Sequence, residues 1–193
     1  MTWSRRRLLK AGGLLAGASV AGASIASASA AGALARAVGA TASPAVKRLA
    51  LRNLHTPESL DLEFYRDGAY VPDALAAIQV LLRDYRNGEQ HPIDPPLLDY
   101  LHDVAQRLGV DPVFHVISGY RSPQTNALLR ERSSGVARYS LHLEGRAIDV
   151  RLAGIDCAEL ADRALGFRRG GVGYYRRSDF VHLDTGAFRT WRG

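Results

Sequence analysis

Two histidines and one aspartate are spaced so that they could bind a single divalent metal. His142 and Asp149 lie in the run Ser140-Leu-His-Leu-Glu-Gly-Arg-Ala-Ile-Asp149, and His182 ends the run Asp179-Phe-Val-His182. Imidazole nitrogens and carboxylate oxygens bind zinc at about 2.0–2.2 Å, so the ligand atoms must come within roughly 4 Å of one another. The set therefore points to a zinc hydrolase.

The spacing of His142 and Asp149 requires the chain to reverse between them. On a straight helix the two residues would be separated by about 10.5 Å along the axis. On a straight strand they would lie more than about 20 Å apart. The pair Glu144-Gly145 is the natural place for a turn, because glycine tolerates the positive φ that such a reversal often needs.

Two short apolar runs predict the strands that would carry the ligands. Residues 147–152 alternate in a way that turns Asp149 away from the Ile, Val and Leu side chains of the core face. Residues 180–183 are rich in aromatic and branched side chains, and a strand there would bring His182 beside Asp149. A lone histidine is more often an ordinary polar residue at a strand end, but three matched positions favour a ligand set. The other histidines receive no site role: His55, His91, His102 and His115.

Charge is distributed unevenly between the amino terminus and the rest of the chain. The formal net charge is +6, from 25 Lys and Arg against 19 Asp and Glu. Five basic residues and no acidic residue precede residue 43, which leaves 20 basic against 19 acidic residues after it. Proteins that bind nucleic acid usually carry a marked basic patch, so this near balance gives no argument for a nucleic-acid partner.

The first 42 residues predict an export signal and a linker. The run Ser4-Arg-Arg-Arg-Leu-Leu-Lys10, followed by an Ala/Gly/Leu-rich stretch, resembles a twin-arginine signal. Small residues offer cleavage sites after Ala28, Ala30 or Ala42. The alternative is an uncleaved membrane anchor, but the Gly, Ala and Ser content makes the stretch only weakly hydrophobic. We therefore expect passage through the twin-arginine (Tat) machinery, removal of the signal and a periplasmic location.

Residues 43–193 are long enough to form one domain. Predicted helices and strands are interspersed along it. The single cysteine, Cys157, cannot form an internal disulfide and is expected to be a small buried apolar residue. Residues 94–108 give the strongest helical pattern, between Asp94-Pro95 and Gly109. Further helices are predicted at 72–87, 122–132 and 156–166, and further strands at 48–53, 60–65 and 113–117.

Three motifs together resemble a known family of enzymes. They are the run from Ser140 to Asp149 with the later His182, the run Ile117-Ser-Gly-Tyr-Arg-Ser-Pro123, and the run Gly170-Gly-Val-Gly-Tyr-Tyr175. They resemble the murein endopeptidase branch, the YcbK or MepK type, of the D-alanyl-D-alanine carboxypeptidase and hedgehog-like zinc metallopeptidase superfamily. The resemblance covers nearly the whole mature chain. It implies a single α+β domain with a central antiparallel sheet and flanking helices.

The resemblance implies a role for each residue of the site. His142, Asp149 and His182 would hold one Zn²⁺ and leave a fourth position for water, as a hydrolytic zinc requires. Asp179 would take the proton, since the family often places an acid three residues before the last histidine ligand. This assignment needs residues 178–179 to lie in a loop, because a regular strand would point Asp179 and His182 to opposite faces. Asp184 shares a face with His182 and is the alternative, as partner of its ring or as the base.

Three polar residues would complete the site. Arg121 resembles the arginine of the family that binds a substrate carboxylate or the developing oxyanion, although by spacing alone it would be a surface arginine. Ser140 would contact substrate or fix the loop that carries His142. Tyr120 would contact substrate or support the ligands.

The implied reaction is hydrolysis of an amide bond in peptidoglycan stem peptides or cross-links. The residues alone indicate a metallohydrolase, and the substrate class comes from the resemblance and the export signal. An endopeptidase and a D,D- or L,D-carboxypeptidase are not separated by the sequence. A different class is a non-catalytic, zinc-containing module that binds the cell wall, which would need no general base.

Overall fold

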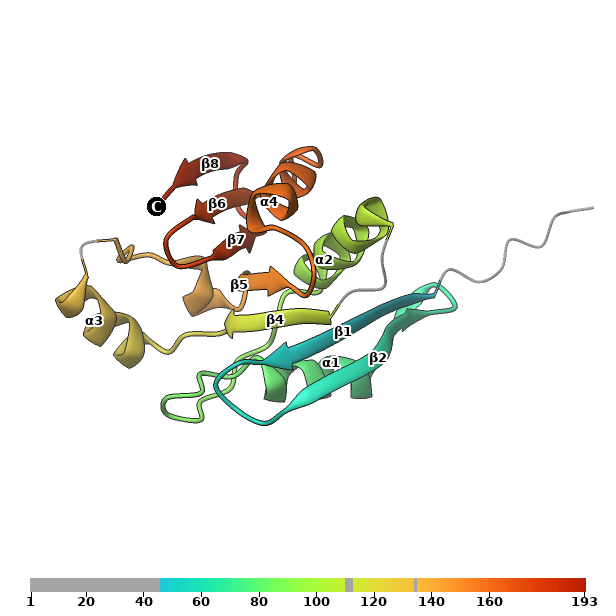
Figure 1. The fold of residues 1–193 in the computed structure, drawn as a ribbon. Coiled ribbons are helices and arrows are strands. Elements are labelled where there is room, and N and C mark those ends of the chain that lie inside the picture. Colours follow the sequence, from blue (N-terminus) through green and yellow to red (C-terminus); the bar gives the residue numbers. More distant parts are fainter. Residues whose placement is uncertain (1–45, 110–112, 134) are drawn as a thin grey trace, which may run out of the picture. The chain divides into compact units, whose positions relative to one another are not determined.

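One mixed sheet organises the part of the chain that the structure describes, which comprises residues 46–109, 113–133 and 135–193 of a computed structural model (Figure 1). Within these residues eight strands run in the order β3-β2-β1-β4-β5-β7-β6-β8. Their bounds are β1 Lys47–Asn53, β2 Ser59–Arg66, β3 Ala69–Tyr70, β4 Val113–Ser118, β5 Ala147–Leu152, β6 Gly171–Tyr175, β7 Phe180–Asp184 and β8 Arg189–Arg192. The predicted signal and linker, residues 1–42, lie outside the described residues.

The pairing of the strands is mostly antiparallel, with two parallel exceptions. β1 and β2, which correspond to the strands predicted at 48–53 and 60–65, pair as an antiparallel hairpin, and β4, β5, β7 and β6 continue the sheet with antiparallel neighbours. β1 is parallel to β4, because the chain crosses over through other elements between them. β8 is parallel to β6, because it lies beyond β6 and not beside β7. The predicted α+β fold is confirmed, and the sheet is mixed at these two junctions.

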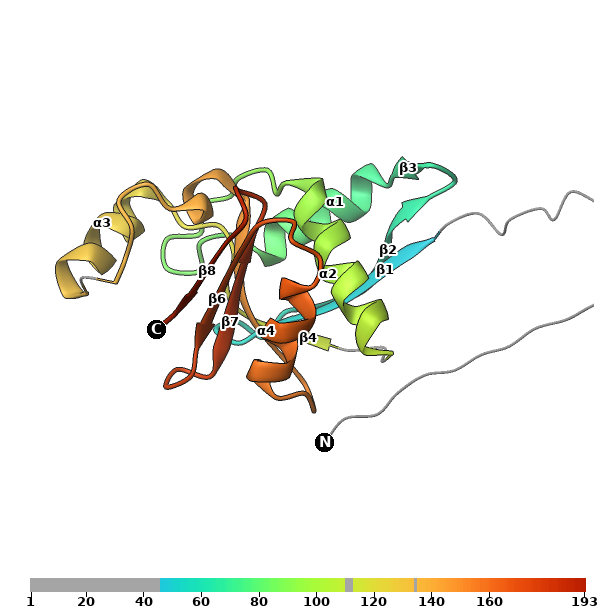
Figure 2. The ribbon, with the colours of Figure 1, turned by 90° about the horizontal axis from the view of Figure 1, so that it is seen from above.

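Three helices pack against the sheet, and a fourth lies apart from them (Figure 2). α1 (Pro72–Leu81) contacts β2, α2 (Pro95–Leu108) contacts β1, and α4 (Cys157–Leu165) contacts β5, β6 and β7. α3 (Pro123–Arg132) follows β4 at one end of the sheet. No helix among the described residues is long and apolar enough to cross a membrane. The helices and strands share one apolar core, whose strand residues include Leu49, Leu51, Phe114, Val116, Ile148, Val150, Val181 and Leu183.

The element bounds follow local sequence signals in most places. α2 ends at Gly109, whose φ of 66° is left-handed, and α3 begins after Ser122, whose hydroxyl accepts a hydrogen bond from the Thr125 amide at 3.2 Å. The Asp156 carboxylate caps α4 through the Ala158 amide at 2.7 Å.

The helix predicted over residues 72–87 is wrong in its second half, because α1 ends at Leu81. Long-range hydrogen bonds to the Leu82 backbone and the Asp84 side chain hold the chain in a different course after Leu81. The Leu82 carbonyl accepts from the Tyr120 amide at 2.7 Å, and the buried Asp84 carboxylate accepts from the amide and hydroxyl of Ser122 at 3.0 and 2.8 Å. These contacts join the end of α1 to the segment between β4 and α3.

Gly145 makes the turn that the ligand spacing requires. It ends the 3₁₀ helix η1 (Leu141–Glu144) with a φ of 64°, and β5 begins two residues later. Its backbone also touches the start of α2, since its carbonyl accepts a hydrogen bond from the Asp94 amide at 3.0 Å. A Cβ at Gly145 would lie 2.1 Å from the Pro92 carbonyl oxygen. Both the turn and the close approach therefore exclude a side chain.

Replacement of Gly145 by alanine is expected to destabilise the fold more than the same change at Gly154. Gly154 has a φ of 78° and open space around it, so Gly154→Ala adds only left-handed strain of about 1–2 kcal/mol. Gly145→Ala adds the clash with Pro92, for about 1–3 kcal/mol more. Urea unfolding of the two variants measures the difference, and equal losses of unfolding free energy would contradict this account of the turn.

Candidate metal centre

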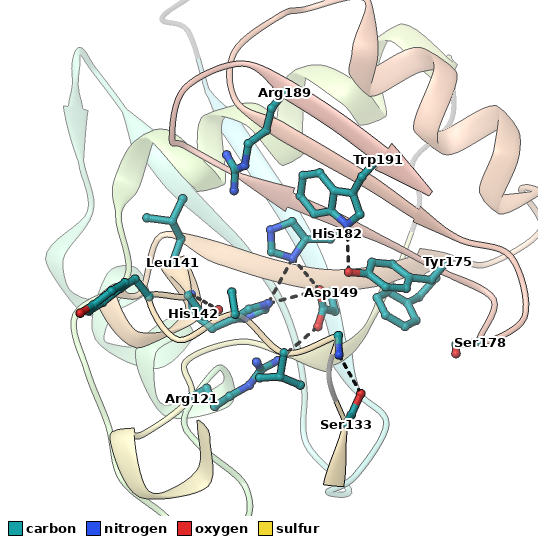
Figure 3. A pocket seen from close by; sticks show the side chains of 16 residues that line it. Arg121, Ser133, Leu141, His142, Asp149, Tyr175, Ser178, His182, Arg189 and Trp191 are labelled. Atoms are coloured by element: carbon teal, nitrogen blue, oxygen red, sulfur yellow. Dashed lines mark hydrogen bonds and ion pairs between the residues drawn. The ribbon is translucent and has the colours of Figure 1, made fainter. Parts of the chain in front are cut away.

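The three predicted ligands converge at one point on the sheet (Figure 3). His142 lies on η1, Asp149 on β5 and His182 on β7, and the pairing of β5 with β7 sets Asp149 opposite His182. Asp149 Oδ1 lies 2.9 Å from His182 Nδ1 and 3.3 Å from His142 Nε2, and the two imidazole nitrogens are 3.2 Å apart. All three side chains are buried.

The outer nitrogen of each imidazole is bound to an oxygen that can only accept a hydrogen bond. His142 Nδ1 lies 2.7 Å from the Gly119 carbonyl, and His182 Nε2 lies 2.9 Å from Asp184 Oδ2. These nitrogens therefore carry the hydrogens, and the lone pairs of His142 Nε2 and His182 Nδ1 face Asp149. Three acceptors so close together repel one another unless a proton or a metal cation lies among them. The donor set thus fits a divalent metal.

The pKa values of the cluster reflect its excess of negative charge. Burial lowers the pKa of His182, but hydrogen bonds to Asp149 and Asp184 and their negative charges outweigh it and raise this pKa to about 9. Burial lowers the pKa of His142. Burial alone would raise the pKa of Asp149, yet the charges and hydrogen bonds of the two histidines hold it well below its usual range. The cluster therefore attracts a positive charge, which a proton on His182 supplies in the absence of metal and which a bound metal would supply in its place.

The segment between β4 and α3 holds His142 in place. A Cβ at Gly119 would lie 2.5 Å from the Leu82 carbonyl oxygen, so only glycine lets the Gly119 carbonyl occupy its position beside the imidazole. The Arg121 amide donates to the His142 carbonyl at 3.0 Å. Ser140 caps η1 by accepting from the His142 amide at 3.4 Å, and it also lines the pocket. Ser140 therefore has the loop-fixing contact that the sequence offered as one of its roles.

Asp184, which is not among the residues that line the pocket, holds His182 in place. Its carboxylate is fully buried and accepts hydrogen bonds from the amides of Gly171 and Gly186, each at 2.9 Å, in addition to the His182 contact. Arg189 donates to both of its oxygens, at 2.6 and 3.0 Å. These hydrogen bonds and the His182 contact keep the pKa of Asp184 well below its usual range, against burial.

The glycines of the 170–175 motif provide space for these contacts. A Cβ at Gly171 would lie 2.4 Å from Asp184 Oδ2 and 2.7 Å from Arg189 Nη1, and a Cβ at Gly173 would lie 2.4 Å from the Trp191 ring. Sequence reasoning identified the motif but missed Arg189 and Trp191. Both residues lie on the short strand β8, and only its parallel pairing with β6 brings them to the centre.

A pocket of about 520 Å³ opens over the ligands. One wall is formed by Ser133, residues 135–137 and residues 139–142, and the other by β6, β7 and β8 with aromatic side chains. Tyr175 stacks on Phe180 with 4.4 Å between ring centroids, and its hydroxyl accepts from Trp191 Nε1 at 2.9 Å. Figure 3 shows the Tyr175 and Trp191 rings beside the cluster. The centre is therefore reachable by a ligand.

Arg121 lies at the pocket and Tyr120 does not. The Arg121 guanidinium is 3.6 Å from Asp149 Oδ2, and its Nε is buried without a hydrogen-bond partner among the described residues. Burial lowers the pKa of Arg121. The Tyr120 hydroxyl instead donates to Glu89 at 3.0 Å, and its ring stacks on His91 outside the residues that line the pocket.

Asp179 lies in a turn, as its assignment requires, but it is not among the residues that line the pocket. Residues 176–179 connect β6 to β7, and Asp179 has a left-handed φ of 52°. The carboxylate is 63% exposed and lies 3.2 Å from Arg151 Nη1. Its neighbour Ser178 lines the pocket. The two candidate acids therefore differ in surroundings, because Asp184 is buried and bound while Asp179 is accessible.

Comparison with known proteins agrees with this arrangement. Residues 41–191 match the M15 peptidase family described as peptidoglycan L,D-endopeptidase MepK. Proteins of that name from Escherichia coli K12 and Shigella flexneri are each 44% identical over 155 residues, which are 80% of this chain and 85% of theirs. A relative from Haemophilus influenzae is 40% identical over 153 residues, 79% of this chain and 82% of its own. No solved structure matches the chain. The chain belongs to the peptidoglycan L,D-endopeptidase MepK family of peptidases.

Proposed function

We propose that the protein is a zinc-dependent peptidoglycan endopeptidase that cuts an amide bond in cross-links or stem peptides. The observation that carries the proposal is the convergence of two imidazole lone pairs and one carboxylate at the floor of an open pocket. A metal with three protein ligands and an open side is the arrangement of a hydrolytic site. The names of the relatives support an L,D bond as the target.

A divalent metal held by His142, Asp149 and His182 would supply a Lewis acid that activates water towards a peptide carbonyl. The residues of the chain provide the rest of the site. The Arg121 Nε is buried without a hydrogen-bond partner among the described residues, and its other nitrogens lie 3.6 Å from Asp149 and 3.4 Å from Asn126. This guanidinium binds a carboxylate or the developing oxyanion of the substrate. Asp184 holds the His182 ring in the orientation that presents Nδ1.

Asp179 is the proposed proton acceptor. Its carboxylate is exposed, and the adjacent Ser178 already lines the pocket, so a rotation of the 176–179 turn is the movement that the role requires. In that movement Asp179 leaves Arg151. Asp184 is less suited, because its carboxylate is fully buried and both its oxygens accept hydrogen bonds.

The proposed place of action is the periplasm, after export through the twin-arginine machinery. The sequence of residues 1–42 supports the export route. The substrate named for the relatives, peptidoglycan, lies outside the cytoplasmic membrane.

Zinc is expected to bind once per chain and to be lost when a ligand is removed. His142→Ala, Asp149→Ala and His182→Ala each delete one of the three donors, so each variant should retain far less than one zinc after dialysis. The control is His115→Ala, which removes a histidine of β4 that is not part of the cluster. Atomic absorption measures the zinc content. Equal zinc in the His142→Ala and His115→Ala proteins would refute the site.

Cleavage of defined muropeptides tests the reaction. The protein is expected to cut muropeptides joined by an L,D cross-link, to lose activity on removal of zinc with a chelator and to regain it when zinc is restored. Mass spectrometry of the products names the bond. Removal of only a terminal residue from uncross-linked stems would indicate a carboxypeptidase. Tight zinc binding without cleavage of any muropeptide would indicate a wall-binding module.

Replacement of the two candidate acids separates their roles. Asp179→Asn should lower kcat by about 10²–10⁴ with zinc content unchanged, because a proton acceptor acts in the transition state. Asp184→Asn should weaken zinc binding itself, because it loosens a ligand. Asp67→Asn is the matched control, since Asp67 is also an exposed aspartate at a left-handed turn position. Full activity of Asp179→Asn would exclude it as the base.

A further inference from the structure

The last strand of the fold reaches the candidate metal centre from the far side of β6. β8 pairs in parallel with β6, so that Arg189 lies opposite Gly171 and Trp191 opposite Gly173. The glycines leave room for both side chains, because a Cβ at either position would clash with them. An edge strand with little buried surface therefore places one large side chain beside His182 and another on Asp184, the partner of His182.

Arg189 is bound to the carboxylate that holds His182. Its Nη2 donates to Asp184 Oδ2 at 2.6 Å and its Nη1 to Asp184 Oδ1 at 3.0 Å, the two-pronged geometry that suits an arginine and a carboxylate. Asp184 Oδ2 is also the oxygen that meets His182 Nε2 at 2.9 Å. One oxygen thus joins the guanidinium to the imidazole.

We propose that Arg189 is a positioning residue of the metal centre, which fixes Asp184 and through it the orientation and tautomer of His182. The proposal rests on the metal site proposed above. Asp184 is fully buried, and Arg189 is the cation that compensates its charge, since His182 presents only a neutral N–H when it binds metal. Without Arg189 the carboxylate keeps the amide hydrogen bonds to Oδ1 but loses a donor on the oxygen that holds His182.

Trp191 lies next to both ends of the contact that runs from Arg189 through Asp184 to His182. Its ring lies 5.2 Å from the His182 ring and 5.1 Å from the Arg189 guanidinium, measured between centroids and from the guanidinium carbon. Its position is fixed by the hydrogen bond to Tyr175. The Arg189 side chain is therefore held at the pocket wall with 46% of its surface exposed.

Metal affinity without substrate distinguishes positioning from substrate binding. Zinc dissociation constants are measured on the full chain by competition with a chromophoric chelator. Arg189→Gln is expected to weaken zinc binding about 10–100-fold, the usual effect of removing a partner of a metal-bound histidine. Arg189→Lys, which keeps the charge but not the fork, should lie between Arg189→Gln and the wild type. The absorption bands of the cobalt-substituted protein should change with Arg189→Gln as well.

The matched control is Arg48→Gln at the other end of the sheet. Arg48 makes the same two-pronged contact, at 2.6 and 2.8 Å, with Asp61 on the neighbouring strand β2. Its loss should leave zinc affinity unchanged. Thermal unfolding of the metal-free proteins shows whether each variant is folded, and Arg189→Lys provides the test if Arg189→Gln is not.

The double variant Asp184→Asn/Arg189→Gln tests whether Arg189 acts through Asp184. If it does, the double variant should bind zinc no more weakly than Asp184→Asn alone. Additive losses, or wild-type affinity and cobalt spectrum in Arg189→Gln, would overturn the inference. A wild-type protein that binds no metal would instead refute the proposed function, so the two failures are distinguishable.

Discussion

The site depends on a requirement that is placed on two buried imidazole rings. To bind a cation together with Asp149, each ring needs an unprotonated nitrogen beside that carboxylate, and a fixed oxygen that accepts from its other nitrogen holds it in this tautomer. The two oxygens come from different parts of the chain. The Gly119 carbonyl serves His142 and the Asp184 carboxylate serves His182. Much of what surrounds the cluster keeps these two oxygens in position.

The apolar core and the polar cluster are fixed by the same strand register. Asp149 lies opposite His182 because Ile148 and Val150 face the core together with Val181 and Leu183. Side chains alternate along a strand, so a slip of one residue would turn Asp149 into the core and expose an apolar neighbour. The burial of branched residues on one face therefore sets the geometry of the ligands on the other.

Local signals predicted much of the fold, and long-range contacts account for the rest. The turn at Gly145, the face of Asp149 and the bounds of α2 follow from residues close in sequence. The early end of α1 does not, because it is set by hydrogen bonds to Tyr120 and Ser122 about 38 residues further along the chain. Residues close in sequence do not indicate the parallel pairing of β8 with β6 either. The contact of Arg189 with Asp184 depends on that pairing and was therefore missed.

Three aspartates near the centre have different surroundings, and these surroundings divide their roles. Asp149 faces the pocket between two imidazoles, so it can bind a cation. Asp184 is sealed beneath His182 with donors on both oxygens, so it can orient a ring but cannot exchange a proton with a substrate. Only the Asp179 side chain is exposed. It lies beside Arg151 and the Cys157 thiol, and its exposure keeps the ion pair with Arg151 weak. A proton acceptor must be reachable in both protonation states, and this condition favours Asp179 over its buried neighbour.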